Sequence, residues 1–189
     1  MADKNDTLRE VGVFALGTLA GLLLGRVGTP MAAKTVGLAR AASGGGDAFD
    51  ELTADHKRVL AALDQAGTAQ GAARMPLFLL IKRDLSKHAL AEEDVIYPLL
   101  ADKLGASADA ARLYEEHGAV KTLLSEIELA LEVGDDLRYR DRVSALRETV
   151  RVHAADEETV WFPNLRELLD DKQRVLVSGK VDREKALLV

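Results

Sequence analysis

The feature that most constrains the fold of this chain is a string of eleven residues that occurs twice. HALAEEDVIYP runs from His88 to Pro98, and HAADEETVWFP runs from His153 to Pro163. Both strings begin with histidine and carry glutamate at offsets four and five, valine at seven, an aromatic residue at nine and proline at ten. Such matched spacing indicates two structural units of the same kind within one chain.

The other two of the four histidines also stand in matched surroundings. Asp55-His56 and Glu116-His117 are each followed by valine three residues, and leucine seven residues, after the histidine. Each half of the sequence therefore supplies one lone histidine and one His-x-x-x-Glu.

The segment between residues 47 and 170 has the apolar spacing of amphipathic helices, and no window alternates with the period of a strand. Asp47 is expected to cap the first helix and Ser107 the third. The second helix is expected from about Met75 to Leu100, and Gly134 is expected to separate the third from the fourth. Four such helices with short connections predict an all-α, antiparallel, up-down four-helix bundle over residues 47–170.

Residues 1–46 differ in character from this segment. Val11 to Gly25 carries no charge and has glycine at every fourth position from Gly17, which predicts an apolar glycine-rich helix followed by a flexible Ser-Gly-Gly-Gly linker. For residues 11–30 membrane association and homo-oligomerisation are both open, and a spanning segment would leave the bundle on the cytoplasmic side. Residues 171–189 form a tail, helical or disordered.

Composition narrows the classes of partner and site. The net charge of −6, without a basic stripe, argues against a nucleic-acid partner. The absence of cysteine excludes disulfides, thiolate zinc sites and iron–sulfur clusters, and it is compatible with a reducing, cytoplasmic setting.

Helix geometry brings the donors of the repeat together. A residue four positions along a helix lies about 40° away on the same face, so each leading histidine has its first glutamate as a neighbour. The second glutamates, Glu93 and Glu158, point about 140° away and are expected to be solvated or to support a ligand from outside. Six inward donors are thereby predicted to converge in the core: His56, His88, Glu92, His117, His153 and Glu157.

Burying four imidazoles and two carboxylates without partners would cost many kcal/mol, and a metal removes that cost. Packing alone could account for histidine at one of these positions, but leucine would fill the same space without the cost of burying polar atoms. The nitrogen and oxygen donors suit iron, manganese or zinc. Two carboxylates favour a pair of bridged ions, with iron as the first choice.

The strings HALAEEDVIYP and HAADEETVWFP, with ADHKRVL and EEHGAVKTLL, resemble the hemerythrin-like HHE cation-binding domain. The resemblance covers residues 48 to 169 and implies a four-helix bundle around two Fe ions with a bridging oxo or hydroxo group. It further implies that the terminal ligands are His56, His88, His117 and His153. The bridging carboxylates would be Glu92 and Glu157.

The chain departs from oxygen-carrying hemerythrins at one position. A fifth histidine is expected four residues after His117, where this chain has Lys121. Fewer protein ligands leave exchangeable positions, which favours a non-haem di-iron protein that binds, senses or reacts with oxygen (O2), peroxide or nitric oxide (NO) in a stress response. The alternatives are an iron-binding, iron-sensing or storage module, and a membrane-associated or oligomerising interaction protein with a structural metal.

Overall fold

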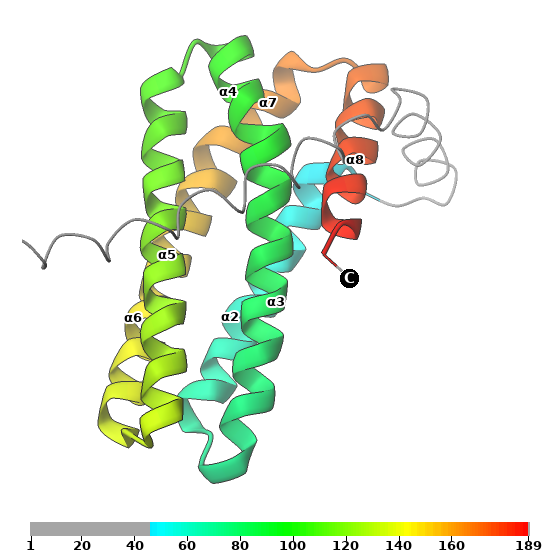
Figure 1. Cartoon of the computed structure of the whole chain (residues 1–189). Helices are drawn as coiled ribbons and strands as arrows, with labels where there is room; N and C mark the ends of the chain where they lie inside the picture. Colours follow the sequence, from blue (N-terminus) through cyan, green and yellow to red (C-terminus); the bar gives the residue numbers. More distant parts are fainter. Residues whose placement is uncertain (1–45, 189) are drawn as a thin grey trace, which may run out of the picture.

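The computed structural model describes residues 46–188, and this part of the chain is helical without any strand. The long helices form four rods, which lie side by side (Figure 1). They are α2 (Ala48–Thr68), α3 (Arg74–Ala91) continued by α4 (Tyr97–Leu104), α5 (Ser107–Val133), and α6 (Asp136–Asp156) continued by α7 (Phe162–Leu168). A 3₁₀ turn, η1 (Gly71–Ala73), follows α2, and the last helix is α8 (Asp171–Ala186).

The rods pack in the order expected of an up-down bundle. α2 packs along α3 and α6, and α5 packs along α6 and α3, with short connections between consecutive rods. The predicted helical bundle is therefore confirmed. The glycine-rich N-terminal helix predicted in residues 1–46 lies outside the described residues.

Local chemistry sets the helix ends. The Asp47 carboxylate accepts hydrogen bonds from the backbone N–H groups of Phe49 and Asp50, and the Asp50 carboxylate accepts from Asp47, which completes a capping box. Gly134 ends α5 with φ of +70°, as predicted. The prediction that Ser107 caps α5 is wrong, because Ser107 is already helical and the residue before it is an alanine.

Both long composite rods contain a π-helical turn that the sequence analysis did not predict. η2 (Glu92–Ile96) joins α3 to α4, and η3 (Glu157–Trp161) joins α6 to α7. Pro98 has no N–H to donate within the first of these turns. The backbone carbonyl of Glu93 instead accepts the Tyr114 hydroxyl at 2.5 Å.

The π turns change which residues face the core. One extra residue in a turn rotates the following residues by about 100° about the helix axis, relative to a regular α-helix. Tyr97, five residues after Glu92, would lie about 140° from it on a regular helix and lies about 40° from it here. The matched Phe162 is turned inward in the same way, and both side chains are buried.

The apolar core is divided into two clusters by a polar layer. One cluster includes Phe49, Leu52, Leu100 and Leu113, and the other includes side chains from Val59 to Val150. All four histidines lie in the sequence between members of the two clusters, so they form a buried layer across the bundle.

The tail forms α8, which packs against α3, α2 and η2 beside the bundle (Figure 1). A capping box of Asp170 and Gln173 starts the helix, and Val177 and Val181 are buried beneath it. Near its end, the Lys185 ammonium donates to the carboxylates of Glu51 and Asp55 on α2.

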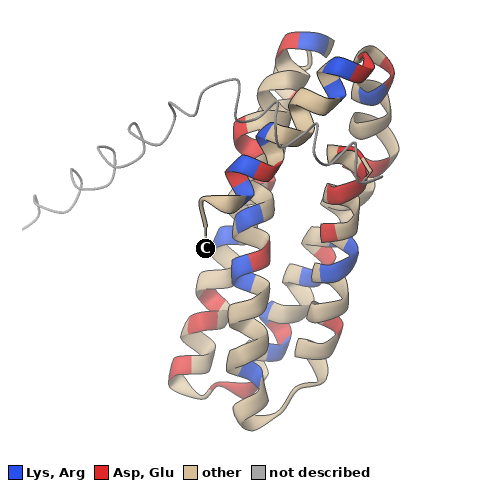
Figure 2. Cartoon of the chain, turned by 90° about the vertical axis from the view of Figure 1, so that its right-hand side faces the viewer, with Lys and Arg blue, Asp and Glu red and all other residues tan. Residues whose placement is uncertain are grey.

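The outer faces are mixed in charge. Figure 2 shows basic and acidic positions interspersed along the helices rather than gathered by sign. Among residues 46–188 none of the helices combines the length and the apolarity needed to cross a bilayer. The expectation of membrane association concerns residues 11–30, outside the described part.

We predict that Lys185→Ala lowers the free energy of unfolding of the metal-free protein by about 1–3 kcal/mol. The substitution removes one cation from the buried carboxylate of Asp55, which then keeps Arg58 and the facing ring of His88. Lys180→Ala, at an exposed position of the same helix, should change it by less than about 0.5 kcal/mol. Urea unfolding followed by circular dichroism measures both, and equal midpoints for the two variants would contradict this role of Lys185.

Candidate metal centre

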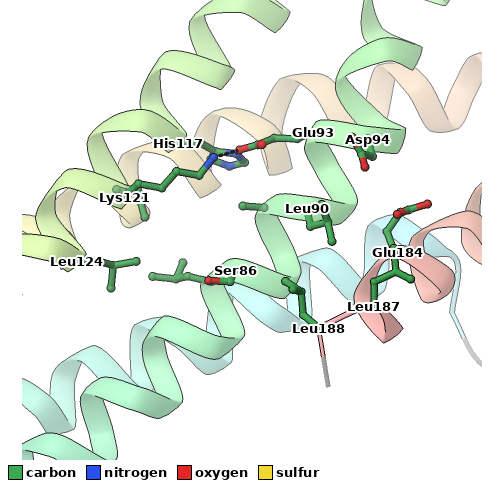
Figure 3. A pocket seen from close by; sticks show the side chains of 13 residues that line it. Ser86, Leu90, Glu93, Asp94, His117, Lys121, Leu124, Glu184, Leu187 and Leu188 are labelled. Atoms are coloured by element: carbon green, nitrogen blue, oxygen red, sulfur yellow. Dashed lines mark hydrogen bonds and ion pairs between the residues drawn. The ribbon is translucent and has the colours of Figure 1, made fainter. Parts of the chain in front are cut away.

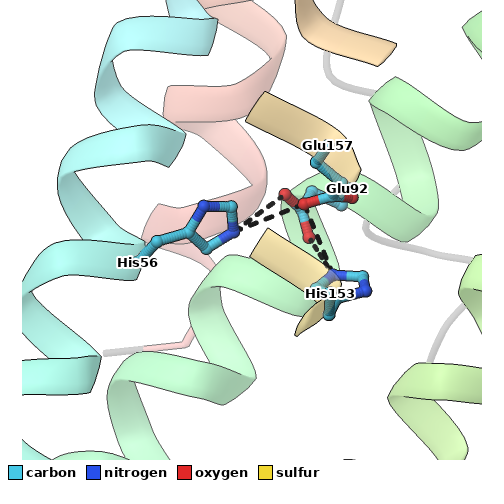
Figure 4. A group of neighbouring side chains, drawn as sticks. All are labelled: His56, Glu92, His153 and Glu157. Atoms are coloured by element: carbon cyan, nitrogen blue, oxygen red, sulfur yellow. Dashed lines mark ion pairs between the residues drawn. The ribbon is translucent and has the colours of Figure 1, made fainter. Parts of the chain in front are cut away.

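The structure brings all six predicted residues together in the buried layer. Each histidine comes from a different rod, and the two glutamates begin the π turns. His56, Glu92, His153 and Glu157 each offer a donor atom, and these atoms lie within 4.8 Å of one another (Figure 4). His88 and His117 complete the group, with their Nε2 atoms 3.0 and 3.3 Å from Glu92 Oε2.

The two carboxylates occupy the centre, and each reaches histidines of both halves. Glu157 Oε2 lies 3.3 Å from Nε2 of His56 and 3.3 Å from Nε2 of His153. Glu92 Oε2 lies 3.0 Å from Nε2 of His88 and 3.3 Å from Nε2 of His117. A carboxylate that lies between histidines of both halves is placed to bridge two cations.

Several donor atoms point into the centre without a hydrogen-bond partner among the described residues. They are Nε2 of His56, Nε2 of His88, Oε1 of Glu92 and Oε2 of Glu157. Buried polar atoms are nearly always paired, because each unpaired one costs about 1–3 kcal/mol. Bound cations would satisfy these lone pairs and offset the carboxylate charge, so the residues fit a metal centre.

Every histidine also has a carboxylate facing its outer nitrogen. The Nδ1 atoms pair with Glu158 at 2.9 Å from His56, Glu93 at 3.0 Å from His117, Glu116 at 2.8 Å from His153 and Asp55 at 3.6 Å from His88. Partners of this kind fix the ring orientation and direct the Nε2 lone pair inward. Four such pairs in one layer are typical of metal-ligating histidines.

The origin of these carboxylates follows the repeat. Glu93 and Glu158, expected to be solvated or supporting, support the lone histidine of the opposite half. Asp55 and Glu116 support the second histidine of their own half, and the sequence analysis assigned them no role. The sequence carried one sign of these two residues, because an acidic residue directly precedes each lone histidine.

Basic side chains hold the supporting carboxylates from outside. Lys121 donates to Glu93 at 2.8 Å, and Arg112 donates to Glu116. The Lys121 side chain is 61% exposed, so this residue faces solvent rather than the centre. Lys121 thus occupies the position of the fifth histidine of the oxygen carriers. Its ammonium group contacts Glu93, the carboxylate that pairs with His117.

A seventh polar group, which sequence reasoning missed, lies in the centre. The Tyr97 hydroxyl is 3.0 Å from His117 Nε2 and 3.1 Å from Glu157 Oε1. Its counterpart Phe162 stacks on the His56 ring, with centroids 6.1 Å apart and planes at 3°. The aromatic residue at offset nine was recognised in the repeat, but only the π turn aims it at the centre.

Charge pairing dominates the electrostatics of the centre. Burial disfavours the charged form of His88, but Glu92 and Asp55 outweigh it and raise its pKa to about 9. Burial is likewise outweighed at His153, where Glu157 and Glu92 raise the pKa to about 11. Burial and both central carboxylates raise the pKa of Tyr97 well above its ordinary value.

A small cavity of about 20 Å³ adjoins the histidines. All four histidines line it, and its other walls are mainly aliphatic side chains: Val59, Leu85, Ala89, Val120 and Val150. A space of this size accepts a single water-sized molecule.

Comparison with known proteins gives two findings. Residues 47–165 match the family model of the hemerythrin HHE cation-binding domain. The chain is also 32% identical, over 127 residues, to a protein of Nostoc sp. named DNA nickase. That match covers 66% of this chain and 35% of the relative, so the chain corresponds to about a third of that protein. With the matched segment spanning the whole histidine and glutamate layer, the chain belongs to the hemerythrin HHE cation-binding domain family.

Proposed function

We propose that this protein holds two iron ions between its halves and binds or reacts with a small ligand such as oxygen, peroxide or nitric oxide. The observation that carries the proposal is the position of Glu92 and Glu157, each of which contacts histidines of both halves. One ion would be held by His56 and His88 and the other by His117 and His153. The set has no sulfur donor, which suits iron, with manganese and zinc as alternatives.

An iron pair, when bound, supplies one-electron redox chemistry and exchangeable coordination positions. The protein contributes orientation, because each imidazole is fixed by its outer carboxylate. It also shields the centre from water, since the four histidines and the two central glutamates are buried and apolar clusters lie on both sides of them. Both contributions favour a reactive centre that is shielded from bulk water.

The cavity supports a ligand of diatomic size. Its aliphatic walls, which include Val59, Leu85 and Val120, face the four histidines, so a small molecule held there would lie directly beside the proposed ions. A larger groove of about 430 Å³ lies between α3, α5 and the end of α8 (Figure 3). Groove and cavity share four lining residues, namely Leu85, Ala89, His117 and Val120, so small motions of these side chains would admit a ligand from outside.

The absent fifth histidine favours reaction or sensing over simple oxygen carriage. Position 121 supplies a lysine that faces solvent, so the donors available to one ion differ from those of the oxygen carriers. A cytoplasmic role in handling reactive species is consistent with this centre.

We expect the iron-loaded protein to show near-ultraviolet absorption bands that shift when azide, peroxide or nitric oxide is added. Small anions and diatomics would enter exchangeable positions beside the cavity. The measurement is an absorption titration of oxidised protein with counted iron. Absorption bands that stay unchanged with all three ligands, together with iron loss coupled to unfolding, would favour an iron-buffering role.

We predict that His153→Ala and Glu157→Ala each lower bound iron and abolish most of the rise in melting temperature that iron gives to the natural protein. Each variant removes a donor, and ligand-linked stabilisation follows the affinity. Glu148→Gln, on the exposed face of the same helix, is the matched control and should keep both properties. Unchanged metal content in Glu157→Ala would remove this residue from the ligand set.

We predict that Glu158→Gln weakens iron affinity by about 10–100-fold while leaving the number of ions bound at saturation unchanged. The amide keeps the volume of the side chain but loses the charge that faces His56 Nδ1. Competition against a chromogenic chelator measures the affinity. A variant that binds iron as tightly as the natural protein would show that this support is dispensable.

A further inference from the structure

The surroundings of the Tyr97 hydroxyl are unusual for a buried phenol. Four polar atoms lie within 3.5 Å of it, and all belong to the proposed ligands. They are His117 Nε2 at 3.0 Å, Glu157 Oε1 at 3.1 Å, Glu92 Oε2 at 3.4 Å and His153 Nε2 at 3.5 Å. The residue is 1% exposed.

Donation by the phenol alone does not account for these contacts. A phenol carries one proton and can donate it to one acceptor at a time. His117 and His153 each present Nδ1 to a carboxylate, which leaves an inward lone pair on both Nε2 atoms when the rings are neutral. Those two nitrogens are 3.2 Å apart, and the phenol oxygen faces both.

The spacing of these three atoms suits a shared cation. Ligands about 2.1 Å from an ion and at right angles to each other lie about 3.0 Å apart. The oxygen of Tyr97 and the two Nε2 atoms are separated by 3.0, 3.2 and 3.5 Å. A cation among them would turn three crowded lone pairs into three bonds.

The comparison between the halves of the chain isolates the hydroxyl. Phe162 holds the position of Tyr97 in the second string, is equally turned inward by a π turn, and packs on His56. A phenyl ring therefore satisfies the packing at this offset. The extra oxygen of Tyr97 stands only on the side of His117 and His153, where it needs a partner to offset its burial.

We propose that Tyr97 is a seventh protein donor, whose phenolate oxygen binds the cation held by His117 and His153. The inference rests on the proposed function, since it requires a cation at that position. Binding breaks the O–H bond, forms an oxygen–metal bond and releases one proton to solvent, and the nearby cation favours the phenolate. Exchangeable positions are then concentrated on the ion held by His56 and His88.

The test uses the full chain loaded with ferrous iron and oxidised in air. Phenolate bound to ferric iron gives a visible charge-transfer band and enhanced ring vibrations in resonance Raman spectra. We expect both in the natural protein and in Tyr139→Phe, the loss of another buried hydroxyl, which donates to the backbone of Ala66. Tyr97→Phe should lose both signals while the iron count and the near-ultraviolet bands persist.

Ring-deuterated tyrosine provides a measurement that does not depend on any variant. The enhanced vibrations of the natural protein should shift on deuteration. Two bound ions without a visible band, or a band retained by Tyr97→Phe, would overturn the assignment of Tyr97 and leave the di-iron proposal standing. A natural protein that binds no iron would overturn both.

Discussion

The structure depends on the burial of a polar layer across the middle of an apolar bundle. Four imidazoles and two carboxylates lie between the two apolar clusters, where each unsatisfied donor carries a large desolvation cost. An outer carboxylate faces the Nδ1 atom of every ring, within hydrogen-bond distance at three of them and 3.6 Å away at His88, so the unpaired atoms of the layer are the inward ones and His88 Nδ1. The outer carboxylates and their basic partners hold the inward lone pairs in place, so a bound cation would add to the stability of the fold.

That requirement explains how far from the centre its supports extend. Asp55 faces His88 and is itself held by Lys185 of α8, so a helix outside the four rods contributes to the orientation of a buried ring. Lys121 and Arg112 hold the supports of His117 and His153 in the same way. Exposed residues that would pass for ordinary surface charges thus belong to a second layer of the centre.

The bundle and the six inward donors could be predicted from the sequence because both follow from a regular helical period. His88 and Glu92 lie one turn apart in either an α-helix or the start of a π turn, so their pairing was insensitive to the irregularity that follows. Tyr97 lies beyond the extra residue, where a period of 3.6 points it away from the centre. Asp55 was missed for another reason: it acts on a different helix, and sequence spacing does not encode that contact.

The two halves are alike in their framework and differ in what they place on it. Matched positions supply the histidines, the central glutamates, the outer carboxylates and both π turns. The halves differ in the aromatic residue, which is Tyr97 in one and Phe162 in the other, and in Lys121, four residues after His117. The symmetric framework offers matched donors on both sides of the centre, and the Tyr97 hydroxyl is a polar group that the second string does not repeat. The aromatic pair therefore makes the polar layer unequal on its two sides.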